Sequence, residues 1–369
     1  MKSFPPKLTA PADDEIEVSI FGPGKGEALA VHLGGGRWMT VDSCVEQRTG
    51  IHPTLQYFER IGVDPATQVE FVVGTHAHDD HVAGISLLVE AATNATFITS
   101  IAYRGEEFFA TVARDAALGG GLRERVRKEY DDVYKTMEKR AGSRKPTRIH
   151  AVAESMVVAR VAEAWSGGPQ VAVTALSPSH TAIQNNHRHM REALTQPSEE
   201  RRLDGFDPNQ TSVALWVQVG ELALLLGADL LIGPTGAGWK AVDASHFPTV
   251  KASLIKVPHH GSSTAHFDRT WTELLTARPL ALVAPFRTGN VNIPKPDDVA
   301  RIRAGAGEAY LTAQPKPPTL SKEQRHTRAD IPYGFRGRDQ YGIVGHVQAR
   351  QVYGTDVWRV GVSAPAFRL

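Results

Sequence analysis

The sequence predicts an α/β (α+β) protein in which two β-sheets pack face to face and helices cover their outer sides. Short apolar segments bounded by glycine-rich turns predict strands, and apolar residues spaced three or four positions apart predict helices. The strands come in sets with helices between them, which differs from the strict alternation of a doubly wound sheet. The 369 residues, 41% of them hydrophobic and 22% charged, suffice for a large core.

The first part of the chain is rich in predicted strands. Apolar runs predict the strands, and glycine-rich turns such as GPGKGE and GGG separate the first three of them. The predicted elements are, in order, strands Glu17–Phe21, Ala28–Leu33 and Arg37–Asp42, helix Pro53–Ile61, strand Val69–Val73, helix Val82–Ala91 and strand Thr96–Ser100.

A charged segment follows, from Arg104 to Lys145. Its apolar residues have helical spacing between many acidic and basic ones, which predicts one or two solvated helices packed on the core. Contact with a substrate or a partner is the alternative interpretation.

The second part returns to strands. Two of them, SVALWVQV and LALLLGAD, form a predicted hairpin around Gly220-Glu221. The other predicted elements are strand Val171–Leu176, strand Ala252–Val257, helix Phe267–Thr276, strand Leu280–Pro285, helix Asp297–Ala304 after Pro296, loop Gln314–Pro318, and strands Gly342–Gln348 and Val352–Gly361.

Composition excludes several classes of protein. The 41 Lys and Arg residues balance 40 Asp and Glu, which argues against nonspecific coating of nucleic acid but leaves a local basic patch open. A single cysteine, Cys44, excludes a disulfide framework within the chain and a zinc ribbon, and is expected to be a buried small residue. The N-terminus has no signal-like apolar stretch, and polar residues interrupt the apolar run Val213–Gly233, so we expect a cytoplasmic protein without membrane contact.

The strongest motif is Thr75-His76-Ala77-His78-Asp79-Asp80-His81, directly after the strand end FVVG. On an extended segment His76 and His78 point to the same side and can bind one metal ion. Asp80 and His81 begin a helix and can serve a second ion, whereas Asp79 is expected to face solvent or cap the helix. Nitrogen and oxygen ligands without a thiolate favour Zn²⁺, with Mn²⁺ as the alternative.

These residues resemble the HxHxDH signature of the metallo-β-lactamase fold superfamily. Asp42 in TVDS resembles that family's early aspartate, Asp229 in LLGAD resembles the carboxylate that bridges two metal ions, and IKVPHHGS resembles the late strand whose histidine completes the second site. The resemblance implies an αββα sandwich.

Within the superfamily, the chain is most similar to the hydrolase domain of ComEC-type competence proteins, and also to phosphorylcholine-esterase-like relatives. The similar segments are EVSIFGPGKGEALAVHLGGGRWMTVDS, NQTSV, LIKVPHHGSSTA and NVNIPKPDDVARI. We therefore expect a single elaborated domain, 1–369, with a core at about 16–101 and 171–312. A charged helical insert at about 102–170 and an extension at about 313–369 resemble no known segment, and neither does the stretch 182–208.

Three positions depart from the family pattern or leave a choice. His180 in SPSHT stands where many members place a third histidine on the first metal ion, yet ComEC-type proteins usually lack it, so ligand and loop residue both stay open. Of His259 and His260, the second is favoured as the ligand and the first as a residue near the substrate. Lys295 stands where ComEC-like relatives show a histidine before proline.

The resemblance implies a binuclear metal-dependent hydrolase, in which a hydroxide bridging two divalent ions attacks the substrate. The implied ligands are His76, His78, Asp80, His81, Asp229 and His260. Asp80, Asp229 and His259 are the catalytic candidates, and Asp42, Asn209 and Ser262 are expected to support the ligands or contact the substrate.

ComEC-type similarity favours phosphodiesters of nucleic acid or nucleotides as the substrate. Basic residues in 122–145 and Lys316–Arg338, with Tyr333, Phe335 and Tyr341 for stacking, could then contact a polyanion, although a solvated surface is the alternative interpretation of each segment. Two other functions stay open: hydrolysis of a small ester, lactone or amide on the same fold, and a partner-dependent effector subunit that docks through its inserts and is inactive alone. The remaining histidines, at 187, 189, 266, 326 and 346, are expected to be surface or hydrogen-bonded residues.

Overall fold

The structure, a computed structural model, describes residues 4–22, 25–46, 49–103, 124–142, 149–195, 207–242, 250–315 and 344–369. The basic segment Lys316–Arg338, its aromatic residues Tyr333 and Phe335, and the positions Tyr341 and His326 lie outside the described residues.

The first sheet has eight strands in the order β17-β16-β1-β2-β3-β4-β5-β6. Neighbours from β17 to β3 are antiparallel, and those from β3 to β6 are parallel. The strands are β1 (Glu15–Gly22), β2 (Ala28–His32), β3 (Trp38–Val41), β4 (Val69–Gly74), β5 (Thr96–Ser100), β6 (Ile149–Val152), β16 (Gly345–Val352) and β17 (Arg359–Ser363).

The second sheet repeats this plan in the order β18-β15-β12-β11-β10-β9-β8-β7. Its strands β10, β11, β12 and β15 are parallel, and the others pair antiparallel. The strands are β7 (Val157–Val161), β8 (Val171–Ala175), β9 (Leu215–Val219), β10 (Leu222–Leu226), β11 (Ala252–Lys256), β12 (Leu275–Val283), β15 (Glu308–Leu311) and β18 (Phe367–Arg368), while β13 (Phe286–Thr288) and β14 (Val291–Ile293) form a separate hairpin.

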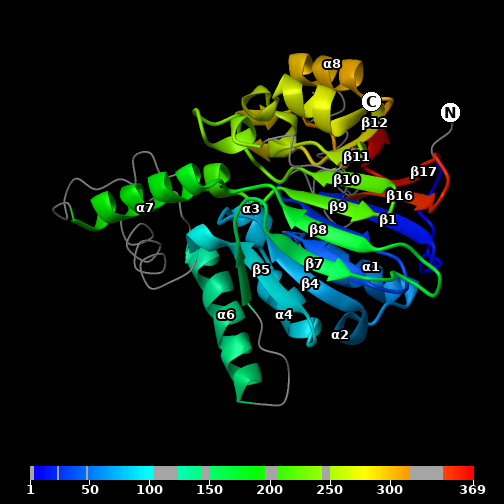
Figure 1. Cartoon of the computed structure of the whole chain (residues 1–369), viewed down its shortest axis with the longest axis horizontal. Helices are drawn as coiled ribbons and strands as arrows, with labels where there is room; N and C mark the ends of the chain where they lie inside the picture. The colour runs from blue at the N-terminus through cyan, green and yellow to red at the C-terminus, as the bar shows by residue number, and fades with distance from the viewer. Residues whose placement is uncertain are drawn as a thin grey trace, which may run out of the picture.

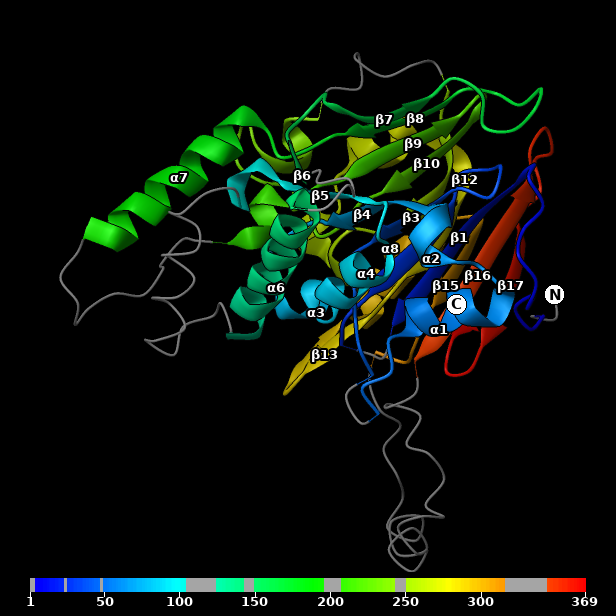
Figure 2. The ribbon, with the colours of Figure 1, turned by 90° about the horizontal axis from the view of Figure 1, so that it is seen from below.

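Three hydrophobic clusters define four layers, helix–sheet–sheet–helix. The central cluster joins inward residues of both sheets, among them Val18 and Leu224. A second cluster packs the first sheet against α1 (Pro53–Ile61), α4 (Ile85–Ala91) and α6 (Glu124–Ala141), and a third packs the second sheet against α8 (Pro296–Gly305). Figures 1 and 2 show these helices on opposite outer faces and α7 (His180–Thr195) projecting away from the sandwich.

The described parts of the insert and of the extension contribute strands to the sandwich. β6 and β7, from the segment 102–170, form one edge strand of each sheet. β16, from the segment after 313, pairs along the whole of β1, with Glu15 opposite Val352 and Gly22 opposite Gly345. The two sheets therefore include strands from outside 16–101 and 171–312, the segments expected to form the core.

Most predicted elements are found near their predicted bounds, and helix α1 has the ends proposed for it, Pro53 and Ile61. The predicted helix Phe267–Thr276 is shorter: the chain makes one wide helical turn at Thr270–Leu274 and continues directly into β12, because Leu275 and the apolar run Leu280–Val283 are buried in the sheet. Helix α7 covers a polar stretch for which the sequence predicted no helix.

Helix α6 confirms the prediction of a solvated helix packed on the core. It buries Val126, Tyr130, Val133 and Met137, whereas its exposed charges form ion pairs within the helix, such as Lys128 with Asp132 and Lys135 with Asp131.

Helix α6 also fixes both ends of α4, the helix that follows the His76–His81 motif. Glu129 accepts hydrogen bonds from the N–H groups of Gly84 and Ser86 and from the Ser86 hydroxyl, at 2.6–3.1 Å. Arg140 donates to the carbonyl oxygens of Val89 and Ala92 at the other end. These contacts satisfy polar groups that a short helix leaves unpaired.

In the described parts of the chain, no helix combines the length and the apolar character needed to cross a lipid bilayer.

We expect Glu129→Ala to lower the free energy of unfolding by about 1–2 kcal/mol, because it removes the cap of α4 and leaves backbone donors without an acceptor. Urea denaturation followed by circular dichroism measures the difference. Glu138→Ala, on the exposed face of the same helix, is the control and should change stability by less than about 0.5 kcal/mol. Equal effects of the two substitutions would contradict the capping role.

Candidate metal centre

The candidate site lies where parallel strands of both sheets end. Asp42 follows β3, the His76–His81 motif follows β4, Asp229 follows β10, and His259 and His260 follow β11. Because the carboxyl ends of parallel strands meet at one edge of a sheet, the sandwich brings residues from four chain segments together there.

Four side chains face a common point through single atoms. Oδ2 of Asp229 lies 3.4 Å from Nε2 of His81 and 3.2 Å from Nε2 of His260, and Oδ2 of Asp80 lies 3.7 and 3.3 Å from the same two nitrogens. Tetrahedral ligands at zinc–ligand distances of about 2.0–2.2 Å are roughly 3.3–3.6 Å apart. Each of these four nitrogen–oxygen pairs is therefore spaced much as two ligands of one cation would be, and His81, Asp229 and His260, with Glu27, offer ligand atoms that all lie within 4.8 Å of one another.

His76 and His78 form the second part of the centre. Nε2 of His76 lies 3.1 Å from Nδ1 of His78, so the two imidazoles face one another as their alternation along the chain predicted. The centre of the His76 ring lies 4.1 Å from that of the His81 ring, so His76 and His78 lie beside His81.

Hydrogen bonds behind the rings hold the ligands in place. Nδ1 of His81 lies 2.7 Å from Oδ2 of Asp42, and Nδ1 of His260 lies 2.9 Å from the carbonyl oxygen of Ala284. In each ring Nδ1 therefore donates to an oxygen, which leaves Nε2 as the nitrogen that can bind a cation. Asp42 occupies the supporting position that the sequence predicted.

Ser212, which the sequence analysis did not assign, connects the two parts of the centre. Its Oγ accepts the backbone N–H of Asp229 at 3.1 Å and lies 3.4 Å from Nδ1 of His76.

The backbone is strained at this site. Among the described residues, five that are not glycine have a positive φ, and four of them lie here: Asp42 (58°), Ala228 (44°), His259 (46°) and His260 (55°). Such conformations cost on the order of 1–3 kcal/mol each and persist only where the surroundings enforce them. At this site they turn the chain sharply at three strand ends and direct the side chains inward.

The protonation of the site follows from burial and from its carboxylates. Burial alone would lower the pKa of His260, but Asp229, Asp80 and Glu27 raise that pKa to about 10. Burial also opposes protonation of His81, yet the same carboxylates, with Asp42, hold its pKa well above the usual value. By contrast, burial lowers the pKa of His76 and His78, which are neutral at pH 7.

The residues present fit a divalent cation. Nε2 of His81 is buried, has no hydrogen-bond partner among the described residues, and faces Asp80 and Asp229. The donors are imidazole nitrogens and carboxylate oxygens, a set suited to Zn²⁺ or Mn²⁺. Four carboxylates (Glu27, Asp42, Asp80 and Asp229) and one ammonium (Lys256) meet here, so the centre carries an excess of negative charge that cations would offset.

His259 lies at the mouth of the centre, and Asn209 and Ser262 lie beside it. Nε2 of His259 is 3.5 Å from Nδ2 of Asn209, and its Nδ1 is 3.0 Å from the hydroxyl of Thr264, which also contacts Ser262. His259 is partly exposed, whereas His260 is buried and belongs to the group with His81 and Asp229. The roles expected for them, His260 as ligand and His259 near the substrate, stay predictions.

His180 is placed apart from the centre. It is exposed at the start of α7, where its Nε2 lies 2.9 Å from Nε2 of Gln184 one turn later. No described contact joins it to the ligands. Of the two roles that the sequence left open, the geometry favours the one that is not a ligand.

Asp79 has partners that the sequence did not predict, since Lys25 and Arg125 each lie 3.4 Å from its carboxylate. Lys295 caps the start of α8, and Pro296 is the first helical residue. Cys44 is buried, as expected. His346 is buried and hydrogen-bonded to Ser19, and His266 pairs with Asp268.

Sequence analysis also missed Glu27 and Lys256, which are fully buried beside the ligands. Lys256 ends a strand whose sequence, LIKV, is otherwise apolar. A charged residue in a buried strand, directly before the metal motif, is the feature that could have identified it.

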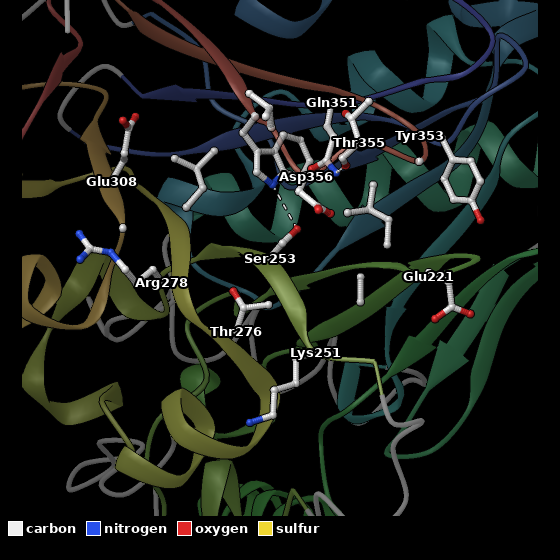
Figure 3. A pocket seen from close by; sticks show the side chains of 17 residues that line it. Glu221, Lys251, Ser253, Thr276, Arg278, Glu308, Gln351, Tyr353, Thr355 and Asp356 are labelled. Atoms are coloured by element: carbon white, nitrogen blue, oxygen red, sulfur yellow. Dashed lines mark hydrogen bonds between the residues drawn. The ribbon is translucent and has the colours of Figure 1, made fainter.

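A separate pocket lies elsewhere on the molecule (Figure 3). Its volume is about 710 Å³, and it is lined by the first residues of β10, β11 and β15 and by the turn after β16, including Lys251, Arg278 and Asp356. It therefore opens at the amino ends of the parallel strands, opposite the end where the metal motif lies, and contains none of the predicted site residues.

Asp229→Asn should weaken zinc binding by at least about 10-fold, because it removes the charge of a ligand that faces both His81 and His260. His180→Ala should leave zinc binding within about twofold of the unchanged chain. Equilibrium dialysis with quantification of bound zinc measures both. A loss of zinc in the His180 variant would show that this residue is a ligand.

Cation binding should release about two protons at pH 7.5. Since the carboxylates raise the pKa of His81 and His260, both rings hold a proton in the cation-free chain and must lose it to coordinate. Titration calorimetry in two buffers of different ionisation enthalpy measures the release. Affinity should also fall as the pH is lowered, and heats that are independent of the buffer would contradict this assignment.

No protein-family model matches the sequence, and no curated protein matches it. Among solved structures, the chain is similar to metallo-β-lactamase SMB-1 bound to 2-mercaptoethanesulfonate (14% identity, 73% of this chain and 86% of the other, TM-score 0.35). It is also similar to the metallo-β-lactamase fold protein YhfI from Bacillus subtilis (14% identity, 85% and 91%, TM-score 0.35) and to Zn²⁺-bound PqqB from Methylobacterium extorquens (12% identity, 80% and 86%, TM-score 0.34). A likeness at these values says nothing about activity, so the chemistry follows from the geometry of this chain alone.

Proposed function

We propose that the protein is a hydrolase with two divalent cations and that it cleaves phosphodiesters of nucleic acid or nucleotides. The observation that carries the proposal is that carboxylate oxygens of Asp80 and Asp229 lie 3.2–3.7 Å from Nε2 of His81 and of His260, with His76 and His78 beside them. Two divalent cations held there would lower the pKa of water and offset negative charge on a phosphoryl group.

The charge of the centre is compatible with an anionic substrate. With neutral imidazoles and every carboxylate ionised, four carboxylates and Lys256 leave an excess of three negative charges, although burial raises the pKa of Glu27. Two divalent cations and an attacking hydroxide would bring the sum to zero. A centre of that charge does not repel a phosphodiester anion, and it accommodates a neutral ester, lactone or amide equally.

Residues at the mouth would orient the substrate. Burial lowers the pKa of His259, so its ring is neutral at pH 7 and can form hydrogen bonds without adding charge. The nearby Asn209 amide is buried and its Oδ1 has no hydrogen-bond partner in the described residues. Nδ2 of Asn209 and the ring of His259 can donate to substrate oxygens next to the centre, whereas Oδ1 of Asn209 can only accept, from a water or a hydroxyl.

The role of the basic segments in binding a long polyanion stays part of the proposal. In the described part of 122–145, cations of α6 are paired with acidic residues of the same helix, and Arg125 is paired with Asp79. Helix α6 therefore offers little unopposed positive charge. The segment Lys316–Arg338 lies outside the described residues, so support for a nucleic-acid substrate comes from the sequence resemblance, and the charge of the centre is compatible with it.

Purified protein with Zn²⁺ or Mn²⁺ should hydrolyse bis-p-nitrophenyl phosphate and cleave single-stranded DNA or RNA. His259→Ala should lower kcat/KM by roughly 10²-fold, the usual cost of removing one hydrogen bond to a developing charge. His266→Ala is the matched control, because this histidine is also partly exposed but is paired with Asp268, and the variant should retain activity.

Parallel assays with lactones and small esters separate the alternatives. Turnover of lactones without turnover of phosphodiesters would overturn the proposed substrate class. A chain that binds both cations yet hydrolyses nothing until another protein is added would instead support the partner-dependent effector.

A further inference from the structure

The buried pair Glu27 and Lys256 lies directly against the metal centre. Lys256 is 1% exposed and Glu27 is 0% exposed, and the Lys256 ammonium contacts Oε1 of Glu27. Removing two charges from water is costly, and their mutual attraction often does not offset that cost. Packing alone therefore does not explain why this pair is buried.

The Lys256 ammonium lies against three fixed acceptors, with hydrogen bonds to two of them and an ion pair with the third. Besides Glu27, Nζ lies 2.8 Å from the carbonyl oxygen of Ala228 and 3.4 Å from Oδ1 of Asp229. An ammonium has three donors, so none is left for a substrate. Lys256 therefore holds both the strained backbone before Asp229 and one oxygen of its carboxylate.

The two oxygens of Asp229 consequently have different surroundings. Oδ1 faces Lys256, whereas Oδ2 faces Nε2 of His81 and of His260. Oδ2 is therefore the oxygen that faces both histidine nitrogens.

Glu27 lies behind the ligand rings. Its oxygens are 3.7 Å from Nδ1 of His81 and 3.6 Å from Nδ1 of His260, and these Nδ1 atoms donate to Asp42 and Ala284. Glu27 therefore faces the Nδ1 atoms of both rings, although its carboxylate also lies within 4.8 Å of ligand atoms of His81, Asp229 and His260. The backbone N–H of Glu27 also donates to the carbonyl oxygen of Asp80 at 3.0 Å, so this residue contacts both ligand loops.

We propose that Lys256, oriented by Glu27, is a positioning residue that restricts Asp229 to one cation-binding oxygen, Oδ2. Glu27 acts through Lys256 and is not a ligand itself. The inference rests on the metal centre of the proposed function, but its test measures cation binding without any substrate.

The double variant Lys256→Met with Glu27→Gln is the decisive test because it removes one charge of each sign and leaves the net charge unchanged. A fall in cation affinity then reports lost positioning rather than altered electrostatics. We expect zinc binding, measured by competition with a chelator, to weaken roughly 10–100-fold, the usual effect of removing a group that orients a ligand. The control pair Lys251→Met with Glu221→Gln, both exposed and at the opposite strand ends, should bind zinc as the unchanged chain does.

Cobalt substitution adds a spectroscopic measurement. If Oδ1 of Asp229 is released, it becomes available as an additional ligand, and the visible absorption of bound Co²⁺ should weaken as the coordination number rises. Should the double variant fail to fold, Glu27→Asp keeps the charge but withdraws the carboxylate by one methylene, and should weaken zinc binding severalfold.

Unchanged zinc affinity and an unchanged cobalt spectrum in the folded variants would overturn the positioning role. Loss of one bound cation in Glu27→Gln alone, with Lys256→Met unaffected, would overturn it by making Glu27 a ligand. An unchanged chain that binds no divalent cation would overturn both this inference and the proposed function, whereas cation binding without hydrolysis would overturn only the latter.

Discussion

The structure depends on the burial of several carboxylates at one point between two sheets. Asp42 and Asp229 are 1% and 2% exposed, and Glu27 is fully buried. Like charges at such distances repel strongly in a poorly polarisable interior, so the fold must supply positive charge or protons there. His81, His260 and Lys256 supply them in the cation-free chain, which explains why two buried imidazoles retain protons. The same excess of negative charge is what makes the centre suited to cations.

The two halves of the sandwich support the centre in similar ways. In the first half, α6 fixes the ends of α4, which follows the His76–His81 motif. In the second half, α8 carries Arg301, which donates to the carbonyl oxygen of Gly261 in the turn after His260 at 2.8 Å. Phe286, from the hairpin that follows β12, stacks on His260 with ring centres 5.3 Å apart. Each ligand loop is therefore held by an outer layer as well as by its strand, and the strained residues of the centre can persist because these contacts enforce them.

The candidate ligands of the His76–His81 motif could be proposed from the sequence because they are close together in it. His76, His78, Asp80 and His81 follow a recognisable strand end, and the alternation of side chains along an extended segment is a local rule. Asp229 and His260 also follow apolar strands that periodicity reveals. Residues such as Glu27, Lys256 and Ser212 act through contacts between distant segments, and their sequence neighbourhoods do not show which strand ends will meet. The same reason explains the edge strands β6, β7 and β16, whose pairing joins segments that the sequence separated from the core.

The local sequence around His180 left two roles open because contacts with another segment of the chain set the direction of the backbone there. Its surroundings, SPSHT, resemble a turn that would present a histidine to the first cation. In the structure the hydroxyl of Ser179, one residue before, accepts the N–H of Ala182 and donates to the carbonyl oxygen of Gly236. These bonds start helix α7 at His180, and because this helix projects from the sandwich, the imidazole lies at the surface.

Without His180, the first cation would have His76, His78 and Asp229 as ligands and would keep positions open for water and a substrate oxygen. An open coordination position is what distinguishes a catalytic metal site from a structural one, so a centre without His180 is compatible with catalysis.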